Sequence, residues 1–326
     1  ASATTALLAD GTVVITTGES TTEIDVGPAD AIGLVGDGTR VVVADESLIR
    51  LYDTTSGNPV ELDGQCRSGL WATSPDGDWL AVHRVDDGAT AVCSTVDGTR
   101  LTAARISGAA APASVIAVDD DGSVALGGDG HIDHVAVERD PATTAVRFTA
   151  VATAIDVRFG GERVTVTALA AANGRIVAGL RSLSNPDGLG RVVVWDAGAG
   201  GIPIQFETDH HVIGAVAFLG ANAALVTAAG QAEPDGPVTI QVWEAETRRQ
   251  LGRGLAGLDG PVSTLAGDAD AIVASGTIGG TYRWRLDLDP TRAICRIVGR
   301  DLTDAEWSTI ADGALARYEQ RAVCPS

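Results

Sequence analysis

The four cysteines, at positions 66, 93, 295 and 324, are the first residues whose spacing suggests chemistry. Structural zinc sites use closely spaced cysteine and histidine pairs, and the chain has no Cys-x-x-Cys pair, so no metal site is expected. Cys295 and Cys324 flank a segment with helical periodicity, and we predict a disulfide that fastens both ends of this helix. A bridge between Cys66 and Cys93 is left open, and four buried thiols in a reducing cytosol are the alternative.

The histidines are the next possible catalytic or metal-binding groups, and they are His83, His131, His134, His210 and His211. The segment His131-Ile132-Asp133-His134 resembles a metal site in composition only. On a strand, its two histidines would point to opposite faces, which favours a structural role. Catalysis would also need a partnered base or nucleophile, and the sequence shows none. We therefore predict no catalytic residue and no cofactor.

Acidic clusters at Asp119–Asp121 and Asp268–Asp270 could suggest calcium binding. Their spacing does not match the Asp-x-Asp-x-Asp-Gly loop with its distant glutamate. Both clusters fall in turns, where aspartate and glycine satisfy the backbone geometry. A pair of carboxylates for glycoside hydrolysis is not singled out among the 43 acidic residues. Turn formation is the favoured interpretation.

The overall charge excludes several classes of partner. The 326 residues include 43 acids and 23 bases, which gives a net charge of −20, and every base is arginine. Such a surface repels phosphate backbones and anionic lipids, so neither nucleic acid nor a membrane is an expected partner. Without lysine, Walker-type phosphate loops and Schiff-base chemistry are excluded. The apolar runs are far shorter than the ~20 residues of a membrane helix. No signal peptide opens the chain, which fits a cytosolic protein, a mature form or an excised domain.

The pattern of apolar residues predicts an all-β protein. Glycine is frequent, with 40 residues, and short runs rich in valine, isoleucine, threonine and alanine are bounded by turn residues. Clear examples of such runs are Thr12–Thr17, Arg40–Ala44, Arg191–Trp195 and Val238–Trp243. The runs repeat as units of four strands, with first strands near residues 32, 69, 114, 163, 213 and 262. A partial unit covers Thr5–Val26, with its third strand over Gly11–Ile15 and its fourth over Thr22–Val26. The C-terminal part of the chain should complete it.

These units resemble the WD-repeat β-propeller family. The resemblance rests on the turn Ser74-Pro75-Asp76-Gly77, on Trp195-Asp196 and Trp243-Glu244 at strand ends, and on His210-His211. The histidine pair falls where the family has its Gly-His signature, which implies a hydrogen bond within the blade. The implied fold is a closed propeller of about seven four-stranded blades over residues 1–290, with six blades as the alternative.

The last segment of the chain has a different pattern. Thr303-Asp304-Ala305-Glu306 forms a capping box, and Trp307, Ile310, Ala314 and Tyr318 follow with helical spacing. Residues 291–326 are thus predicted to form a helical cap packed on the propeller. The string Cys295–Thr303 with Cys324 resembles a tail on bacterial propellers, in actinobacterial regulators that contain a STAND-type NTPase. This resemblance implies an extracytoplasmic location, with a cytoplasmic location as the alternative.

The expected function of the chain rests on its resemblance to these propellers and not on any single residue. The resemblance implies a non-enzymatic sensor or protein-interaction domain of a larger regulator. The alternatives are a hydrolase or lyase with its site at the central channel, and a cytosolic scaffold that gates an NTPase. Two long loops, Ser182–Gly190 and Gly230–Gly236, should share one face with the connection at His210. The predicted binding residues for a protein or small polar ligand, basic or neutral, are Arg181, Asn185, Asp187, His210, His211, Glu233 and Asp235.

Overall fold

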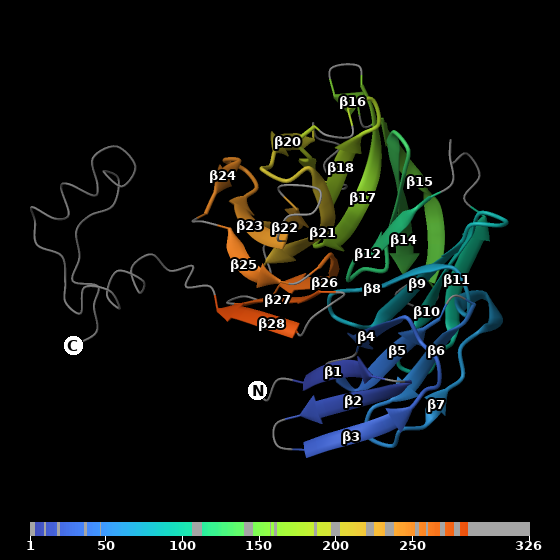
Figure 1. The fold of residues 1–326 in the computed structure, drawn as a ribbon. Coiled ribbons are helices and arrows are strands. Elements are labelled where there is room, and N and C mark those ends of the chain that lie inside the picture. Colours follow the sequence, from blue (N-terminus) through green and yellow to red (C-terminus); the bar gives the residue numbers. More distant parts are fainter. Residues whose placement is uncertain are drawn as a thin grey trace, which may run out of the picture.

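The described residues form seven antiparallel sheets that are arranged in a ring (Figure 1). The computed structural model describes residues 4–9, 11–17, 20–35, 38–45, 47–105, 113–139, 146–156, 158–159, 162–185, 188–196, 203–219, 225–231, 238–251, 254–258, 260–267, 271–276 and 281–285. Apart from the short 3-10 helix η2 (Gly64–Cys66), every regular element in these ranges is a strand. The all-β prediction is confirmed.

The first three sheets run from the N-terminus to residue 105, each with its strands in sequence order. Their strands are β1 (Thr4–Ala9), β2 (Thr12–Thr17), β3 (Ser20–Asp25), β4 (Ala31–Val35), β5 (Arg40–Ala44), β6 (Ile49–Asp53), β7 (Pro59–Val60), β8 (Leu70–Thr73), β9 (Trp79–Arg84), β10 (Ala89–Ser94) and β11 (Arg100–Arg105). The outer strands differ in length, since β7 has two residues and β11 has six.

The other four sheets continue around the ring. Their strands are β12 (Val115–Val118), β13 (Val124–Gly128), β14 (His131–Arg139), β15 (Val146–Asp156), β16 (Arg158–Phe159), β17 (Glu162–Ala172), β18 (Arg175–Ser182), β19 (Arg191–Asp196), β20 (Ile204–Glu207), β21 (Val212–Leu219), β22 (Leu225–Gln231), β23 (Val238–Glu244), β24 (Arg249–Gln250), β25 (Leu255–Leu258), β26 (Val262–Gly267), β27 (Ala271–Gly276) and β28 (Thr281–Arg285). The first strands β4, β8, β12, β17, β21 and β26 begin within one residue of the predicted positions.

The hydrophobic core is divided into layers between neighbouring sheets. Six clusters of buried side chains each join one sheet to the next, from the β1–β3 sheet to the β26–β28 sheet. An inner strand is therefore covered on both faces, which explains why strands such as β19 read as continuous apolar runs rather than as an alternation. Valine and alanine suit these layers because their small, branched or short side chains fit between closely stacked sheets.

Aromatic residues at the ends of the third strands occupy equivalent places in these layers. Trp195 packs against the β12–β15 sheet, and Trp243 packs against the β16–β20 sheet; both are buried. Half-buried Trp284 and buried Tyr52 pack in the same way on the sheets that precede theirs. The prediction that the tryptophans lie in blade packing, and not in one binding cage, is confirmed.

The sheet β1–β3 has the pattern of the first three strands of a blade. In the next two blades, the residue after the third strand donates its backbone N–H to the residue before the second, as in Thr54 to Thr39 and Thr95 to Asp78. Val26 donates to Gly11 in the same way. The segment 11–15 therefore belongs to a second strand and 22–26 to a third, so the predicted third and fourth assignments were wrong. A Val-Val-Ile run suits a second strand as well as a third strand, and the hydrogen bond from Val26 to Gly11 distinguishes the two positions.

The ring thus has six blades of mainly four strands, from β4 to β28, and the smaller β1–β3 sheet beside them. Within the described residues, no strand joins β3 to a fourth neighbour or joins β28 to β1. The predicted helical cap 291–326, its boundary at residue 290 and the Cys295–Cys324 bridge lie outside the described residues. Among the described residues, no helix has the length and apolar character needed to cross a membrane.

A disulfide joins Cys66 to Cys93, which settles the pairing that the sequence left open. Cys66 ends η2, in the connection that leads into β8, and Cys93 lies in β10 of the same blade. Both residues are fully buried in the layer between the β4–β7 and β8–β11 sheets. The bond therefore fastens the entry of this blade to its third strand.

Candidate functional site

The two faces of the ring differ in the turns that they carry. Because successive strands of a blade are antiparallel, the loop between its second and third strands and the connection to the next blade lie on one face. We call this the loop face, and the side with the other turns the turn face. Five large hydrophobic side chains are exposed among the described residues. Leu48, Val85, Leu183 and Leu189 lie in loops of the loop face, and Val96 lies on the turn face.

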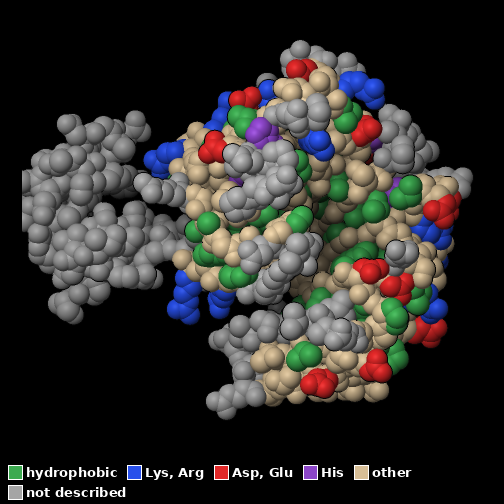
Figure 2. Space-filling view, viewed as in Figure 1, with side chains coloured by type: hydrophobic (Ala, Val, Ile, Leu, Met, Phe, Trp, Pro, Cys, Tyr) green, Lys and Arg blue, Asp and Glu red, His purple; other side chains and the backbone are tan. Residues whose placement is uncertain are grey.

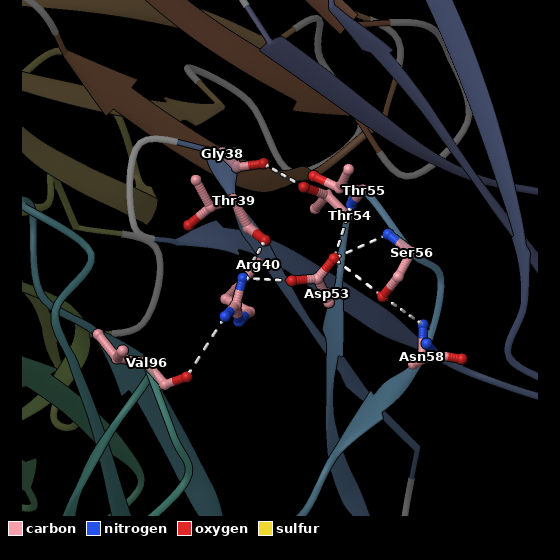
Figure 3. Close-up of polar contacts among 9 residues, drawn as sticks. All are labelled: Gly38, Thr39, Arg40, Asp53, Thr54, Thr55, Ser56, Asn58 and Val96. Atoms are coloured by element: carbon pink, nitrogen blue, oxygen red, sulfur yellow. Dashed lines mark hydrogen bonds and ion pairs between the residues drawn. The ribbon is translucent and has the colours of Figure 1, made fainter.

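Polar residues of the turn face largely satisfy one another. Thr54 donates its hydroxyl to Gly38 O at 2.8 Å, and the equivalent Thr95 donates to Gly77 O at 2.6 Å. Asp53 accepts hydrogen bonds from the backbone N–H and the hydroxyl of Ser56, and it forms an ion pair with Arg40 (Figure 3). The hydrogen bond from the Ser56 backbone is the largest cause of the lowered pKa of Asp53. These contacts bind the turns of a blade to each other.

The acidic cluster at 119–121 is part of this turn chemistry. Asp119 accepts the backbone N–H of Gly174 at 2.6 Å, which links two neighbouring blades, and Asp121 accepts that of Ser123. Gly122 has a φ of +87°, which closes the turn. Burial raises the pKa of both Asp119 and Asp120. The turn interpretation is confirmed for this cluster, while 268–270 lies outside the described residues.

A cavity of about 210 Å³ opens on the loop face of the β16–β20 blade. Its lining residues come from the loop-face ends of β17, β18, β19 and β20 and from the loop after β18; they are Glu162, Val164, Leu180, Arg181, Ser182, Asn185, Gly188, Leu189, Arg191 and Glu207. We call it the loop-face pocket. Val164 and Leu180 are buried at its base, and Leu189 is 47% exposed at its rim.

Two polar contacts shape this pocket. Ser182 Oγ donates to Glu162 Oε2 at 3.1 Å and accepts the backbone N–H of Asn185 at 3.0 Å. This second bond begins the turn of the long loop. Opposite, Arg191 donates from Nε and Nη2 to Glu207 Oε1, at 3.1 and 2.9 Å, from directly paired positions on β19 and β20.

The base of the long loop is fastened to the connection between two blades. The backbone N–H of Gly190 donates to His210 O at 2.5 Å, and Gly190 O accepts both the backbone N–H and the hydroxyl of Thr208, each at 3.0 Å. A Cβ on Gly190 would lie 3.0 Å from His210 O and 3.1 Å from Ile213, so a larger residue would disturb this contact. The loop of one blade and the entry to the next therefore form one unit.

His210 has a fully buried imidazole, and its Nε2 lies 2.8 Å from Thr239 Oγ1. Burial lowers the pKa of His210 to about 4, because the charged form would lose its hydration, and Asp209 offsets this only in part. The ring is thus neutral near pH 7. His210 contributes to the loop face by holding Gly190 and Thr208, while the half-buried His211 lies beside it.

The predicted binding residues are partly brought together. Arg181 and Asn185 line the loop-face pocket, and His210 and His211 lie in the adjoining connection. Asp187, Glu233 and Asp235 lie outside the described residues, as does most of the loop 230–236. Sequence reasoning missed Glu162, Ser182, Arg191 and Glu207. The signal that could have found them is their common place at strand ends of one repeat.

The positions of the histidines bear on the alternatives of metal binding and channel catalysis. His131 Nε2 lies 3.6 Å from Asp133 Oδ2, whereas His134 turns away and packs edge-on against Trp195. The two histidines therefore diverge, as predicted. Within the described part of the chain, no group of three or more potential ligands could hold a metal ion. Figure 2 shows the central hollow with mostly hydrophobic or neutral atoms in its visible wall.

The sequence matches no protein-family model, and no curated protein is significantly similar to it. Solved structures do share the fold. Hydrazine synthase of Kuenenia stuttgartiensis is similar over 88% of this chain and 93% of that one, with a TM-score of 0.62 and 13% identity. A mitotic checkpoint complex matches over 86% and 83%, with a TM-score of 0.61 and 13% identity. Chaetomium thermophilum Sqt1, bound to the N-terminus of ribosomal protein L10, matches over 85% and 79%, with a TM-score of 0.58 and 16% identity.

At these identities the similarity defines the architecture alone. Together with the blades and their aromatic anchors, it shows a β-propeller fold.

Proposed function

We propose that this propeller is a non-enzymatic interaction domain that binds a partner protein on its loop face. The observation that carries the proposal is the grouping of Leu48, Val85, Leu183 and Leu189 on that face. Four of the five large apolar side chains that are exposed among the described residues lie on this face, and Leu189 lines the loop-face pocket. The loop-face pocket lies on the same side, and the Sqt1 propeller was solved with a bound protein segment, which supports a protein as the partner.

Site-specific photo-crosslinking in the source organism tests this proposal. A crosslinking residue at Leu48, Val85 or Leu189 should capture one and the same protein. The matched control is Val96, which is 62% exposed but lies on the turn face, and it should not capture that protein. Capture from Val96 alone, or no common product from the loop-face positions, would contradict the proposal.

Ring closure is a finer part of the proposal. We infer that the chain after Arg285 supplies the fourth strand beside β3, which would make the β1–β3 sheet a seventh blade. Support comes from the three-strand pattern of this sheet and from Tyr52, which packs on it as the tryptophans pack on their preceding blades. Hydrogen exchange tests this: the amides at the free edge of β3 should be protected in the full chain and exposed when residues 286–326 are removed.

The cellular setting is proposed from the C-terminal tail. We infer an extracytoplasmic sensor domain of a bacterial regulator with a STAND-type NTPase, its cap clamped by Cys295–Cys324. The Cys66–Cys93 disulfide is compatible with such a compartment. Thiol titration of the unfolded, unreduced protein should find no reactive cysteine. Four reactive thiols would contradict both the clamp and the location.

A further inference from the structure

The charges of the loop-face pocket are unequally paired. Arg191 gives two hydrogen bonds to Glu207, so that cation is neutralised within the pocket. Glu162 accepts only the hydroxyl of Ser182, and no ion pair joins its carboxylate to a described residue. Among the described residues, the Glu162 carboxylate therefore has no cationic partner.

The alternation of side chains along β18 places Arg181 on the opposite face of the sheet from Glu162. Val164 pairs directly with Ser182, and Leu180 with Arg191, so these four side chains share one face of the sheet with Glu162 and Glu207. Arg181 pairs with Thr165, and neighbouring residues of a strand point to opposite faces. The Arg181 side chain therefore starts from the opposite face of β18 to Leu180 and Ser182, although Arg181 is among the residues that border the pocket.

Part of the pocket lining is apolar. Val164 and Leu180 are buried, and Leu189, which also lines the pocket, is 47% exposed. The cavity of about 210 Å³ is smaller than the ~300–1,000 Å³ of small-molecule sites, and it suits a single side chain. An aliphatic stem would contact these walls while a polar end reaches Glu162.

We propose that the loop-face pocket binds an arginine or lysine side chain of the partner protein, with its cationic group on the Glu162 carboxylate and its stem along Val164, Leu180 and Leu189. This inference rests on the proposed function. Cation–carboxylate hydrogen bonds are stronger than neutral ones. The net charge of −20 favours the approach of a basic partner. Within the described part of the pocket, Arg191 is already paired with Glu207.

Capped amino acids test the pocket in the full chain. We would titrate the protein with Nα-acetyl-L-arginine amide, Nα-acetyl-L-lysine amide and Nα-acetyl-L-citrulline amide, and follow binding by NMR. Citrulline has nearly the shape of arginine without its charge, so its affinity should be on the order of fivefold lower. Glu162→Gln should weaken arginine and lysine binding to the same extent. Glu61→Gln, a control at an exposed carboxylate on the β4–β7 blade, should leave it unchanged.

Equal affinity for the arginine and citrulline probes would overturn the inference, as would unchanged binding by Glu162→Gln. Crosslinking from Leu48 and Val85, on other blades, tests the loop face without the pocket. If those positions capture a protein while no cationic probe binds, the pocket assignment alone is wrong. If the probes bind but no loop-face position captures a protein, a protein side chain is the wrong source of the cation.

Discussion

Two regions of the ring stabilise the same stacking of sheets by different means. In the blades β4–β7 and β8–β11, the disulfide Cys66–Cys93 and the hydroxyls of Thr54 and Thr95 join elements covalently or by hydrogen bonds. In the blades β16–β20 and β21–β25, large aromatic side chains fill the layers, and Phe206 packs on Trp243 with ring centroids 4.8 Å apart. The β4–β7 blade also has an aromatic residue at the end of its third strand, Tyr52, so the two regions differ in the contacts that are added to this common packing.

The two regions also differ in the length of the loops between their second and third strands. The loop before β6 is short, and Asp45 accepts the backbone N–H groups of Ser47 and Leu48, both at 2.8 Å. The Ser47 backbone hydrogen bond is the largest cause of the lowered pKa of Asp45. The loop after β18 is longer, carries Leu183 and Leu189 in solvent and surrounds a pocket. The blades β4–β7 and β8–β11 thus carry short loops with single exposed residues, Leu48 and Val85, whereas the β16–β20 blade carries a longer loop and a pocket on the same face.

The largest effect on stability is expected in the aromatic-packed region. Trp195→Ala should lower the free energy of unfolding by about 3–5 kcal/mol, because the side chain is 4% exposed and its removal leaves a cavity in the layer. Urea unfolding measures this. Trp284→Ala serves as the control, and its effect should be smaller since that ring is only half-buried. An undiminished Trp195→Ala protein would show that this region does not depend on its tryptophans.

Removal of the disulfide tests the other region. The double variant Cys66→Ala, Cys93→Ala should lose about 3 kcal/mol of unfolding free energy, since the bond closes a loop with a sequence separation of 27. Thermal unfolding with and without reductant should then differ more for the native protein than for the variant, which keeps Cys295 and Cys324. If the variant is as stable as the oxidised protein, the hydrogen bonds of this region suffice alone.

The buried histidine makes the aromatic-packed region sensitive to acid. His210 has a pKa of about 4 in the folded protein, below its ordinary value of 6.5. The unfolded chain therefore binds the proton first, and the stabilisation that is present above pH 6.5 is lost as the pH falls toward 4. The loss is on the order of 3 kcal/mol. Melting temperatures at pH 7 and pH 4.5 should differ less for His210→Asn than for the native protein, whereas His211→Asn should behave like the native protein.

Much of this architecture could be predicted, because strand and turn residues act locally. The starts of six first strands, the short loops near Asp45 and Asp87, and the equivalence of Trp195 and Trp243 all follow from the repeat. The assignment of the first unit failed because Thr12–Ile15 is apolar enough for either of two strand positions. Only the contact of Val26 with Gly11 distinguishes them, and a repeat pattern does not contain it.

The pocket was harder to predict, since its chemistry depends on register. Glu162, Ser182, Arg191 and Glu207 are ordinary polar residues at four strand ends, far apart in the chain. Their common face appears only once Val164 is paired with Ser182 and Arg191 with Glu207. Arg181 was predicted from its neighbourhood to the loop, but the alternation of the strand directs it away. A shift of one residue along the strand decides whether a side chain lies on the pocket face or on the opposite face.

A smaller effect is expected from the turn face of the stapled region. Thr54→Val removes the hydroxyl that donates to Gly38 O at 2.8 Å and keeps the shape of the side chain, which is buried (Figure 3). The loss should be about 1 kcal/mol in urea unfolding. Thr55→Val, at an exposed position of the same turn, is the matched control and should change stability little. Equal effects of both variants would show that β propensity, and not this hydrogen bond, is responsible.

The least effect on stability, and the greatest on function, should come from the two long loops. Cutting the loops 182–190 and 230–236 to four residues each should leave the melting temperature nearly unchanged, because loop length alters closure entropy only slowly. The variant should keep Ser182, Gly190 and Gly230, since Gly190 is bonded to His210 and a Cβ on Gly230 would lie 2.9 Å from the His210 side chain. Binding of the crosslinked partner should be lost. If binding instead survives this change and is abolished by substitutions at Asp76 and Asp120, the turn face binds the partner, and the exposed leucines of the loop face reflect drift in unconstrained loops.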